Sequence, residues 1–511
     1  MVSAPIQSRL PDGGSQRVGR ELNASGASER VDGAATARLE EPMLDRSVIE
    51  EVLRTALSRG GSFAEVFAEE RESAAIHLDD GKIEELTSGL DRGAGVRVVH
   101  GEASAYAYSN RLERESLIEA ARAAAASVRD AAAGESPELV DLTRAEPETV
   151  HRAERPAVDL PPQTKVDWLW EADDAARSLD PAVRQVVASY GDSLQHVLIA
   201  SSDGRLVEEE RPRIRFVVQV VAARDGVIQT GFEGPAGIAG VEFMDAHPPR
   251  QVAEKAARQA VTMLDGVPAP AGEMAVVMGP GGGGVLFHEA CGHGLEADLV
   301  QKDSSIYRGK LGQKLASSLV SGVDDSTEPG AWGSFSFDDE GSPAARTVLF
   351  AEGVLESYLY DRIRARHDGL SRSANGRRQS YANLPLPRMT NTSILPGEAD
   401  ADAVLRDTRR GLFASRLGGG QVNPATGDFV FGVTEAYLIE SGEVSRPVRG
   451  ANLVGNGIAI LAAVDAVASD FETLQGICGK EGQGVPVGNG SPTLRIARMT
   501  VGGTDGGGRG G

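Results

Sequence analysis

The chain has 511 residues, of which 41% are hydrophobic and 25% are charged, as is typical of a soluble globular protein. This length predicts two or more domains, each with enough residues to bury a core. The formal net charge of −22 argues against nucleic acid as a partner and against binding to an anionic membrane surface.

The chain contains only two cysteines, Cys291 and Cys478, which are too few for a disulfide scaffold and are typical of a reducing compartment. Residues 1–42 contain no continuous apolar run, so we recognise neither a secretory signal nor a membrane anchor there. We therefore expect a cytoplasmic protein.

The first half of the chain is predicted to form an α/β domain over residues 43–268, with a mixed or antiparallel sheet. Residues 1–42 lack hydrophobic periodicity and are predicted to be a disordered extension. Asp-Gly pairs at 80–81, 203–204 and 225–226 are hairpin turn signals and favour a meandering antiparallel sheet. Strands are expected at 63–67, 74–78, 82–87, 96–100, 103–108, 185–189, 197–201, 206–210, 214–222 and 227–231. Helices are expected at 114–133, 165–179 and 251–264, and a first helix is expected to be capped by Ser47 and ended by Gly60 and Gly61.

A composition shift near residue 270 marks the expected start of a second domain, residues 269–501, which we predict to be mainly antiparallel β with a motif helix that carries a metal site. Residues 502–511 are glycine-rich and are predicted to be a disordered tail. The fold class is therefore α+β. Within this domain we expect a polar, mobile loop at 303–328, an irregular segment at 369–387, a tight corner at 418–420, and strands at 274–278, 333–337, 346–350, 354–360, 388–394, 412–416, 429–431 and 436–440.

The strongest chemical signal is the run HEACGH, in which Glu289 directly follows His288 and His293 closes the motif. Imidazoles that hold zinc beside a carboxylate that accepts a proton from bound water are typical of hydrolytic zinc sites. Five residues at about 100° each would rotate the second ring by roughly 140° from the first on a regular helix. The turn must therefore break or over-wind, and we predict that the helix bends or opens at Gly292, since Gly292 and Gly294 bracket His293 with permissive residues.

A phosphate-binding loop is the interpretation that competes with a metal site. The glycine run at 281–284 follows a predicted strand and could cradle a phosphate, but it lacks the Gly-Lys-Ser/Thr ending of a phosphate-binding loop. We expect instead that these glycines allow another backbone, such as a substrate peptide, to approach closely. Apart from the motif pair and His367, the histidines are scattered singly and are expected to be structural or exposed. They are His77, His100, His151, His196 and His247.

A catalytic zinc ion usually has three protein ligands and an open position. The residues alone leave the third ligand open among Glu296, Cys291, Cys478, His367 and a distant acid. Cys291 would project away from the ion if both histidines face it. Cys478 lies in a predicted glycine-flanked loop, where Lys480 could favour its deprotonation.

Four segments show a resemblance to a known family. HEACGHGLEAD at 288–298, PRMTNTSILPGE at 387–398, GGGQVNPATGDFVFGVTEAYLIE at 418–440 and CGKEGQGVPVGNGSPTLRI at 478–496 resemble the TldD/PmbA metallopeptidases, and the likeness runs from about residue 45 to 500. The chain is most similar to the TldD branch, which keeps the metal motif that the PmbA branch lacks. Residues 1–42 depart from the family pattern.

The resemblance implies one Zn²⁺ per active subunit, bound by His288, His293 and Cys478, with Glu289 as the base that acts on the metal-bound water. It also implies hydrolysis of unfolded or extended peptides, an N-terminal α/β domain, a largely β C-terminal domain, and a dimer, either of identical chains or with a PmbA-like paralogue. The alternative is a binding or scaffolding protein with a structural zinc ion, which would require a fourth protein ligand.

Overall fold

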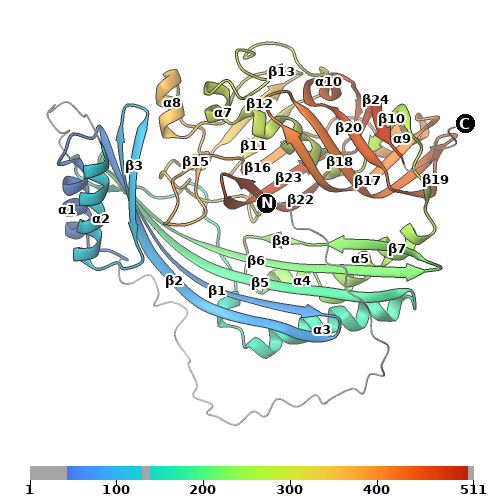
Figure 1. Ribbon diagram of the computed structural model, residues 1–511, viewed down its shortest axis with the longest axis horizontal. Coiled ribbons are helices and arrows are strands. Elements are labelled where there is room, and N and C mark those ends of the chain that lie inside the picture. Colours follow the sequence, from blue (N-terminus) through green and yellow to red (C-terminus); the bar gives the residue numbers. More distant parts are fainter. Residues whose placement is uncertain (1–42, 129–138, 504–511) are drawn as a thin grey trace, which may run out of the picture. The chain divides into compact units, whose positions relative to one another are not determined.

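The computed structural model describes residues 43–128 and 139–503, and from Leu44 onward they belong to one compact unit. Strands predominate and helices accompany them, which confirms the predicted α+β class (Figure 1). The predicted disorder of 1–42 and of most of the tail falls outside the described residues. The domain boundary near residue 269 stays a prediction.

The first sheet has the order β3-β2-β1-β5-β6-β4, with β7 and β8 also paired to β6. The predicted hairpins are confirmed, and Asp80, Gly81, Asp225 and Gly226 all have positive φ as such turns require. The strands are β1 Phe63–Asp79, β2 Lys82–His100, β3 Ala103–Ser109, β4 Thr143–Arg144, β5 Val183–Ser201, β6 Arg205–Arg224, β7 Val227–Glu233 and β8 Ala236–Gly237.

The strands of this sheet are much longer than the sequence analysis predicted, because pairs of predicted strands fuse into one. The polar centre of β1 remains in the sheet since β2 and β5 pair with it on both sides. Buried Glu69 accepts hydrogen bonds from the Gln195 side chain and from the Tyr381 N–H. Hydrogen bonding therefore maintains a strand where hydrophobic alternation stops.

Four longer helices accompany this sheet: α1 Arg46–Leu57, α2 Arg114–Ser127, α3 Pro162–Leu179 and α5 Pro249–Leu264. α2 ends earlier than predicted, at Ser127. α3 and α5 contact each other and strands β5 to β7, and Figure 1 shows both lying along the sheet. Leu169, Phe216 and Ala256 belong to their common buried core.

The second half contains two larger sheets and one pair of short strands. The first has the order β17-β10-β24-β20-β18-β19-β9, with β21 paired to β24, and the second has the order β13-β12-β11-β16-β23-β22. Most pairs are antiparallel, but β10–β17, β16–β23 and β19–β9 are parallel. The strands are β9 Val267–Pro268, β10 Gly272–Met278, β11 Gly322–Asp325, β12 Arg346–Ala351, β13 Val354–Leu355, β14 Gly376–Arg377, β15 Leu386–Pro387, β16 Asn391–Ile394, β17 Arg410–Asn423, β18 Asp428–Glu440, β19 Glu443–Arg449, β20 Asn452–Asn456, β21 Val464–Val467, β22 Glu472–Lys480, β23 Gln483–Ser491 and β24 Leu494–Gly502.

Three local predictions for this half are wrong. Residues 418–420 are not a corner but lie inside β17, where register shifts absorb the irregularity and the Phe431 ring occupies the space beside Gly420. Residues 333–337 are irregular, with a single bridge from Phe337 to Pro343, and the expected strand at 354–360 is reduced to Val354–Leu355 and an isolated bridge from Leu359 to Glu296. Besides α6 Gly282–Phe287, which precedes the histidine motif, the short helices here and near the boundary are α4 Glu242–Ala246, α7 Ala297–Gln301, α8 Arg362–Asp368, α9 Ala401–Arg406 and α10 Gly457–Ala462.

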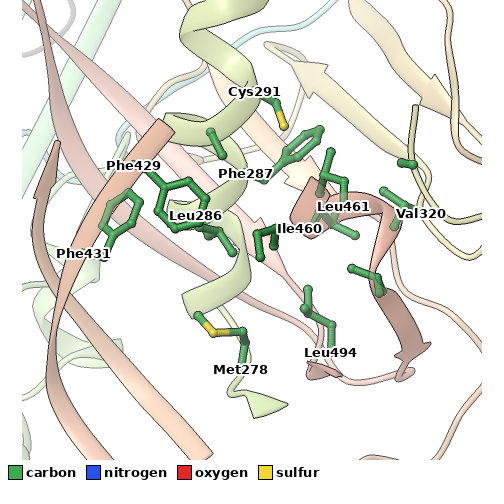
Figure 2. Packing of buried hydrophobic residues seen from close by; sticks show 14 of the residues in the cluster. Met278, Leu286, Phe287, Cys291, Val320, Phe429, Phe431, Ile460, Leu461 and Leu494 are labelled. Carbon is green, nitrogen blue, oxygen red and sulfur yellow. The ribbon is translucent and has the colours of Figure 1, made fainter. Parts of the chain in front are cut away.

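The segment that carries the histidine motif runs through the main hydrophobic core of this half. Figure 2 shows Leu286, Phe287 and Cys291 from this segment among side chains from β10, β18, α10 and β24. Burial of a side chain such as Phe287 contributes about 1.5–3 kcal/mol to stability. The core thus fixes the position of the motif.

Within residues 43–128 and 139–503, every helix is too short or too polar to span a membrane.

Candidate metal centre

The motif lies on a helical segment whose pitch changes twice. Helix α6, Gly282–Phe287, leads into a π-helical turn over His288–Gly292 and then a 3₁₀ turn over His293–Leu295. The N–H of His293 donates to the carbonyl of His288, which is the five-residue hydrogen bond of a π-turn. Because this turn is wider than an α-turn, the two rings lie on the same side, with centroids 5.1 Å apart.

The glycines beside His293 serve a different purpose from the one predicted. Gly292 has φ −51° and ψ −53°, an ordinary right-handed helical conformation. A Cβ at Gly292 would lie 1.9 Å from the sulfur of Met389, and one at Gly294 would lie 2.7 Å from the Tyr307 ring. These glycines therefore permit close packing rather than an unusual backbone.

The glycine run before the motif also contacts the protein itself. A Cβ at Gly284 would lie 2.6 Å from backbone atoms of Asn489 and Gly490 in β23. The backbone that approaches Gly284 is thus a strand of the same chain, and the approach of a substrate peptide to the run stays a prediction. β23 pairs with β22 along its whole length, so this contact brings α6 close to the strand that carries Cys478.

Cys478 lies in strand β22 rather than in the predicted loop. Its Sγ is 3.5 Å from Nε2 of His293. One ligand atom from each of His288, His293 and Cys478 lies within 4.8 Å of the other two. In the described part of the chain, no fourth His, Cys, Asp or Glu joins this group.

The other candidates for a third ligand lie elsewhere. Glu296 is fully buried on the far side of the His293 ring, where its Oε2 is 3.1 Å from Nδ1. Cys291 faces the core and lies 3.2 Å from the Tyr307 hydroxyl, and burial raises the pKa of its thiol to about 12. His367 on α8 has a 41% exposed side chain and pairs with Asp368.

The electrostatic surroundings of Cys478 favour its thiolate. Burial alone would raise its pKa, but hydrogen bonds and charge from His288 and His293 outweigh burial and lower the pKa to about 5. Lys480 does not take the role predicted for it, because its Nζ lies 2.7 Å from Asp298 Oδ1 and 3.0 Å from Glu296 Oε2. The two histidines, rather than the lysine, lower the pKa of the thiol.

The donor set fits a zinc ion. Two imidazoles and one thiolate are soft-to-borderline donors that zinc prefers. His288 Nδ1 is buried, and no hydrogen-bond partner for it occurs among the described residues.

Glu289 lies next to this group, with Oε2 3.9 Å from His293 Nε2 and 29% of its side chain exposed. A partly exposed carboxylate beside the group is accessible to water.

The fold and the site together define a candidate metallohydrolase. Three family models match in order: PmbA/TldA metallopeptidase domain 1 over residues 64–128, the central domain over 155–264 and the C-terminal domain over 271–503. The chain belongs to the PmbA/TldD metallopeptidase family, which confirms the resemblance seen in the sequence.

Curated relatives share most of their length with this chain. A metalloprotease TldD homolog of Haemophilus influenzae is 39% identical, covering 88% of this chain and 94% of the relative. A metalloprotease of Methanothermobacter thermautotrophicus is 36% identical, covering 86% and 96%. A zinc metalloprotease TldD homolog of Saccharolobus solfataricus is 28% identical, covering 67% and 76%.

Solved structures share the fold at lower identity. A Thermotoga maritima protein described as a candidate modulator of a DNA gyrase has a TM-score of 0.75 and 21% identity, covering 89% of this chain and 99% of that one. TldE from Thermococcus kodakarensis has a TM-score of 0.71 and 19% identity, with the same coverage of both chains. At these identities the comparison concerns the fold alone.

Proposed function

We propose that this protein is a zinc-dependent peptidase that hydrolyses peptide bonds in unfolded or extended peptides. The observation that carries the proposal is the convergence of His288, His293 and Cys478 within 4.8 Å, next to the carboxylate of Glu289. The names of the curated relatives, metalloprotease and zinc metalloprotease, support the same activity.

His288, His293 and Cys478 would hold the ion, one per active subunit. Bound zinc supplies a Lewis acid that polarises a peptide carbonyl and makes water more acidic. Glu289 takes the proton from the attacking water, since its carboxylate lies beside the ligand cluster and is partly open to solvent, whereas that of Glu296 is buried. A thiolate ligand donates more charge than an imidazole and weakens the Lewis acid, so the reaction depends more strongly on Glu289.

The alternatives are less well supported. A structural zinc site would have four protein ligands, whereas the group has three among the described residues. A nucleotide site at 281–284 would need open backbone N–H groups, but Gly281 N donates to Ser491 O and β23 packs on Gly284. Both observations favour a catalytic metal site.

The quaternary arrangement and location are also proposals. The solved TldE structure has the same fold, which supports pairing with a PmbA-like paralogue that lacks the metal motif. The fold is equally compatible with a homodimer. We propose a cytoplasmic location, with no nucleic acid or membrane partner, on the charge of −22 and the two unpaired cysteines.

The experiment compares Glu289→Gln with wild type for zinc content and for cleavage of fluorescently labelled, denatured casein. Glu289→Gln should keep one zinc ion, measured by native mass spectrometry, and lose cleavage by about 10²–10⁴-fold, the usual contribution of a general base. His367→Ala, which removes a histidine of α8 outside the ligand group, should keep both. Undiminished cleavage by zinc-loaded Glu289→Gln would refute the role of Glu289.

A further inference from the structure

Four buried charged residues lie directly behind the ligand group, and the proposed chemistry uses none of them. They are Glu296, Asp298, Arg388 and Lys480, whose side chains are 0% to 8% exposed. Desolvating a charge costs several kcal/mol unless it is paired and hydrogen-bonded. Such a cluster beside a candidate metal site therefore requires a reason.

Glu296 contacts His293 from the side opposite Cys478. Its Oε2 accepts a hydrogen bond from Nδ1–H of His293 at 3.1 Å, and Lys480 Nζ lies 3.0 Å from the same oxygen. With its Nδ1–H held by Glu296, the ring would offer Nε2 to a metal ion, and Nε2 is the nitrogen 3.5 Å from Cys478 Sγ. Glu296 thus fixes both the tautomer and the orientation of the ring.

Lys480 connects the same carboxylate to the strand of Cys478. Residues 478 and 480 are two apart in β22, so their side chains lie on the same face of the strand. The three Nζ donors of Lys480 are all engaged, by Glu296, by Asp298 at 2.7 Å and by the Pro387 carbonyl at 3.0 Å. The lysine is therefore held in one position.

Arg388 makes a second connection between these elements. Its Nη2 donates to the backbone carbonyl of Cys478, and its Nε lies 3.9 Å from Glu296 Oε1. Glu296 follows His293 by three residues, and Lys480 follows Cys478 by two. These two residues form an ion pair with each other. An ion pair therefore joins the motif segment to β22 beside the residues that would bind the metal.

We propose that Glu296 is a positioning residue of the zinc site, which, through Lys480 and Arg388, aligns His293 with Cys478. This inference rests on the proposed zinc function. A purely structural ion pair would support the fold alone, and its loss would lower stability without altering the metal. A positioning residue changes how the metal is held even in protein that remains folded.

The first test uses Glu296→Gln, which keeps the shape of the side chain and removes its charge. Zinc affinity, measured by competition with a chromogenic chelator, should fall about 10–100-fold, as is usual when a partner of a ligating histidine is lost. In the cobalt-substituted variant the d–d absorption bands should change, while the thiolate-to-cobalt charge-transfer band remains because Cys478 still ligates. If Glu296→Gln fails to fold, Glu296→Asp is measured in the same way.

The matched control is Asp192→Asn, which removes a buried carboxylate on β5 that pairs with Lys165 of α3. It should lower the melting temperature but leave zinc affinity and the cobalt spectrum unchanged. Zinc affinity of Glu296→Gln within twofold of wild type, with an unchanged cobalt spectrum, would overturn the positioning role alone. Absence of zinc binding by wild type would overturn the proposed function, and the inference with it.

A double-mutant cycle tests the link to β22. Lys480→Met should also weaken zinc binding, and the variant with both Glu296→Gln and Lys480→Met should lose less affinity than the product of the two single losses, because the pair acts as one unit. Strict multiplication of the two losses would show that Glu296 and Lys480 act independently, and would overturn that part of the proposal.

Discussion

His288 and His293 are five residues apart in the chain, yet their rings stand 5.1 Å apart at 86° to each other because the carbonyl of His288 accepts the N–H of His293. A regular α-helix would direct the two rings to different sides. The π-turn is therefore the local feature on which the candidate metal centre depends. Packing around Gly292, rather than backbone flexibility, accommodates this turn.

The first prediction concerns that packing. Gly292→Ala places a methyl group 1.9 Å from the Met389 sulfur, so either Met389 or the turn must move. Overpacking of this kind costs about 1–3 kcal/mol. We expect a lower urea midpoint and weaker zinc binding.

Gly479→Ala is the control for that variant, because a Cβ there meets nothing within 4 Å although the residue adjoins Cys478. It should resemble wild type in both measurements. Equal zinc affinity and stability of Gly292→Ala and wild type would show that the turn tolerates the added methyl group.

The second prediction separates the two cysteines. Cys478→Ser should bind zinc at least ~10-fold more weakly, since a hydroxyl replaces a thiolate ligand. Cys291→Ser should bind zinc as wild type does, because Cys291 faces the core and contacts Tyr307. Native mass spectrometry after dialysis measures both, and equal zinc retention by the two variants would contradict the assignment.

The third prediction concerns removal of the metal. A ligand that binds only the native state stabilises it by about 2.7 kcal/mol at a free concentration of 100 times Kd. A chelator should therefore lower the melting temperature of wild type, and added zinc should restore it. Cys478→Ser should show little change with either treatment, whereas a large chelator effect on this variant would indicate that another site holds the stabilising metal.

Local patterns in the sequence determine much of this structure, but not the parts that depend on distant contacts. The Asp-Gly turns at 80–81 and 225–226 were predictable because positive φ is a local requirement. The histidine motif was also recognisable as a metal site from local sequence, since its residues are neighbours in the chain.

Long-range contacts account for what the sequence could not reveal. The fused strand β1 depends on pairing of Glu69 with the distant Gln195, and the requirement for glycine at 292 depends on Met389. Glu296 was considered only as a possible ligand, because nothing local shows that Lys480 reaches it from β22. The spacing from His293 to Glu296 and from Cys478 to Lys480 was the available signal.

The fourth prediction concerns a buried ion pair between the first sheet and the second half. Arg97 on β2 and Glu340 pair with side chains only 2% and 0% exposed, and Glu340 also accepts the Arg362 N–H. Glu340→Gln leaves Arg97 buried without its charged partner, which typically costs about 3–5 kcal/mol. Urea unfolding measures the loss. Glu50→Gln, which breaks the exposed pairs with Arg46 and Arg54, should lower the urea midpoint much less, because solvent screens these pairs. An equally small loss for Glu340→Gln would contradict the prediction.

The fifth prediction concerns the pH dependence of stability through Glu328. Burial, followed by the charges of Asp325 and Asp324, raises the pKa of Glu328 from 4.5 to about 7. The folded state therefore holds a proton that the unfolded state releases between about pH 4.5 and 7. The stabilisation from this proton is complete below the unfolded pKa and is lost as the pH rises through about 7.

Glu328→Gln cannot ionise, so it should gain stability relative to wild type as the pH is raised from 4 to 8, with the difference developing between about pH 4.5 and 7. Urea midpoints at pH 4, 6 and 8 measure this difference. Glu443→Gln, at an exposed position on β19, should show no such trend. A difference between Glu328→Gln and wild type that stays constant from pH 4 to 8 would mean that the Glu328 carboxyl group titrates alike in the folded and unfolded states.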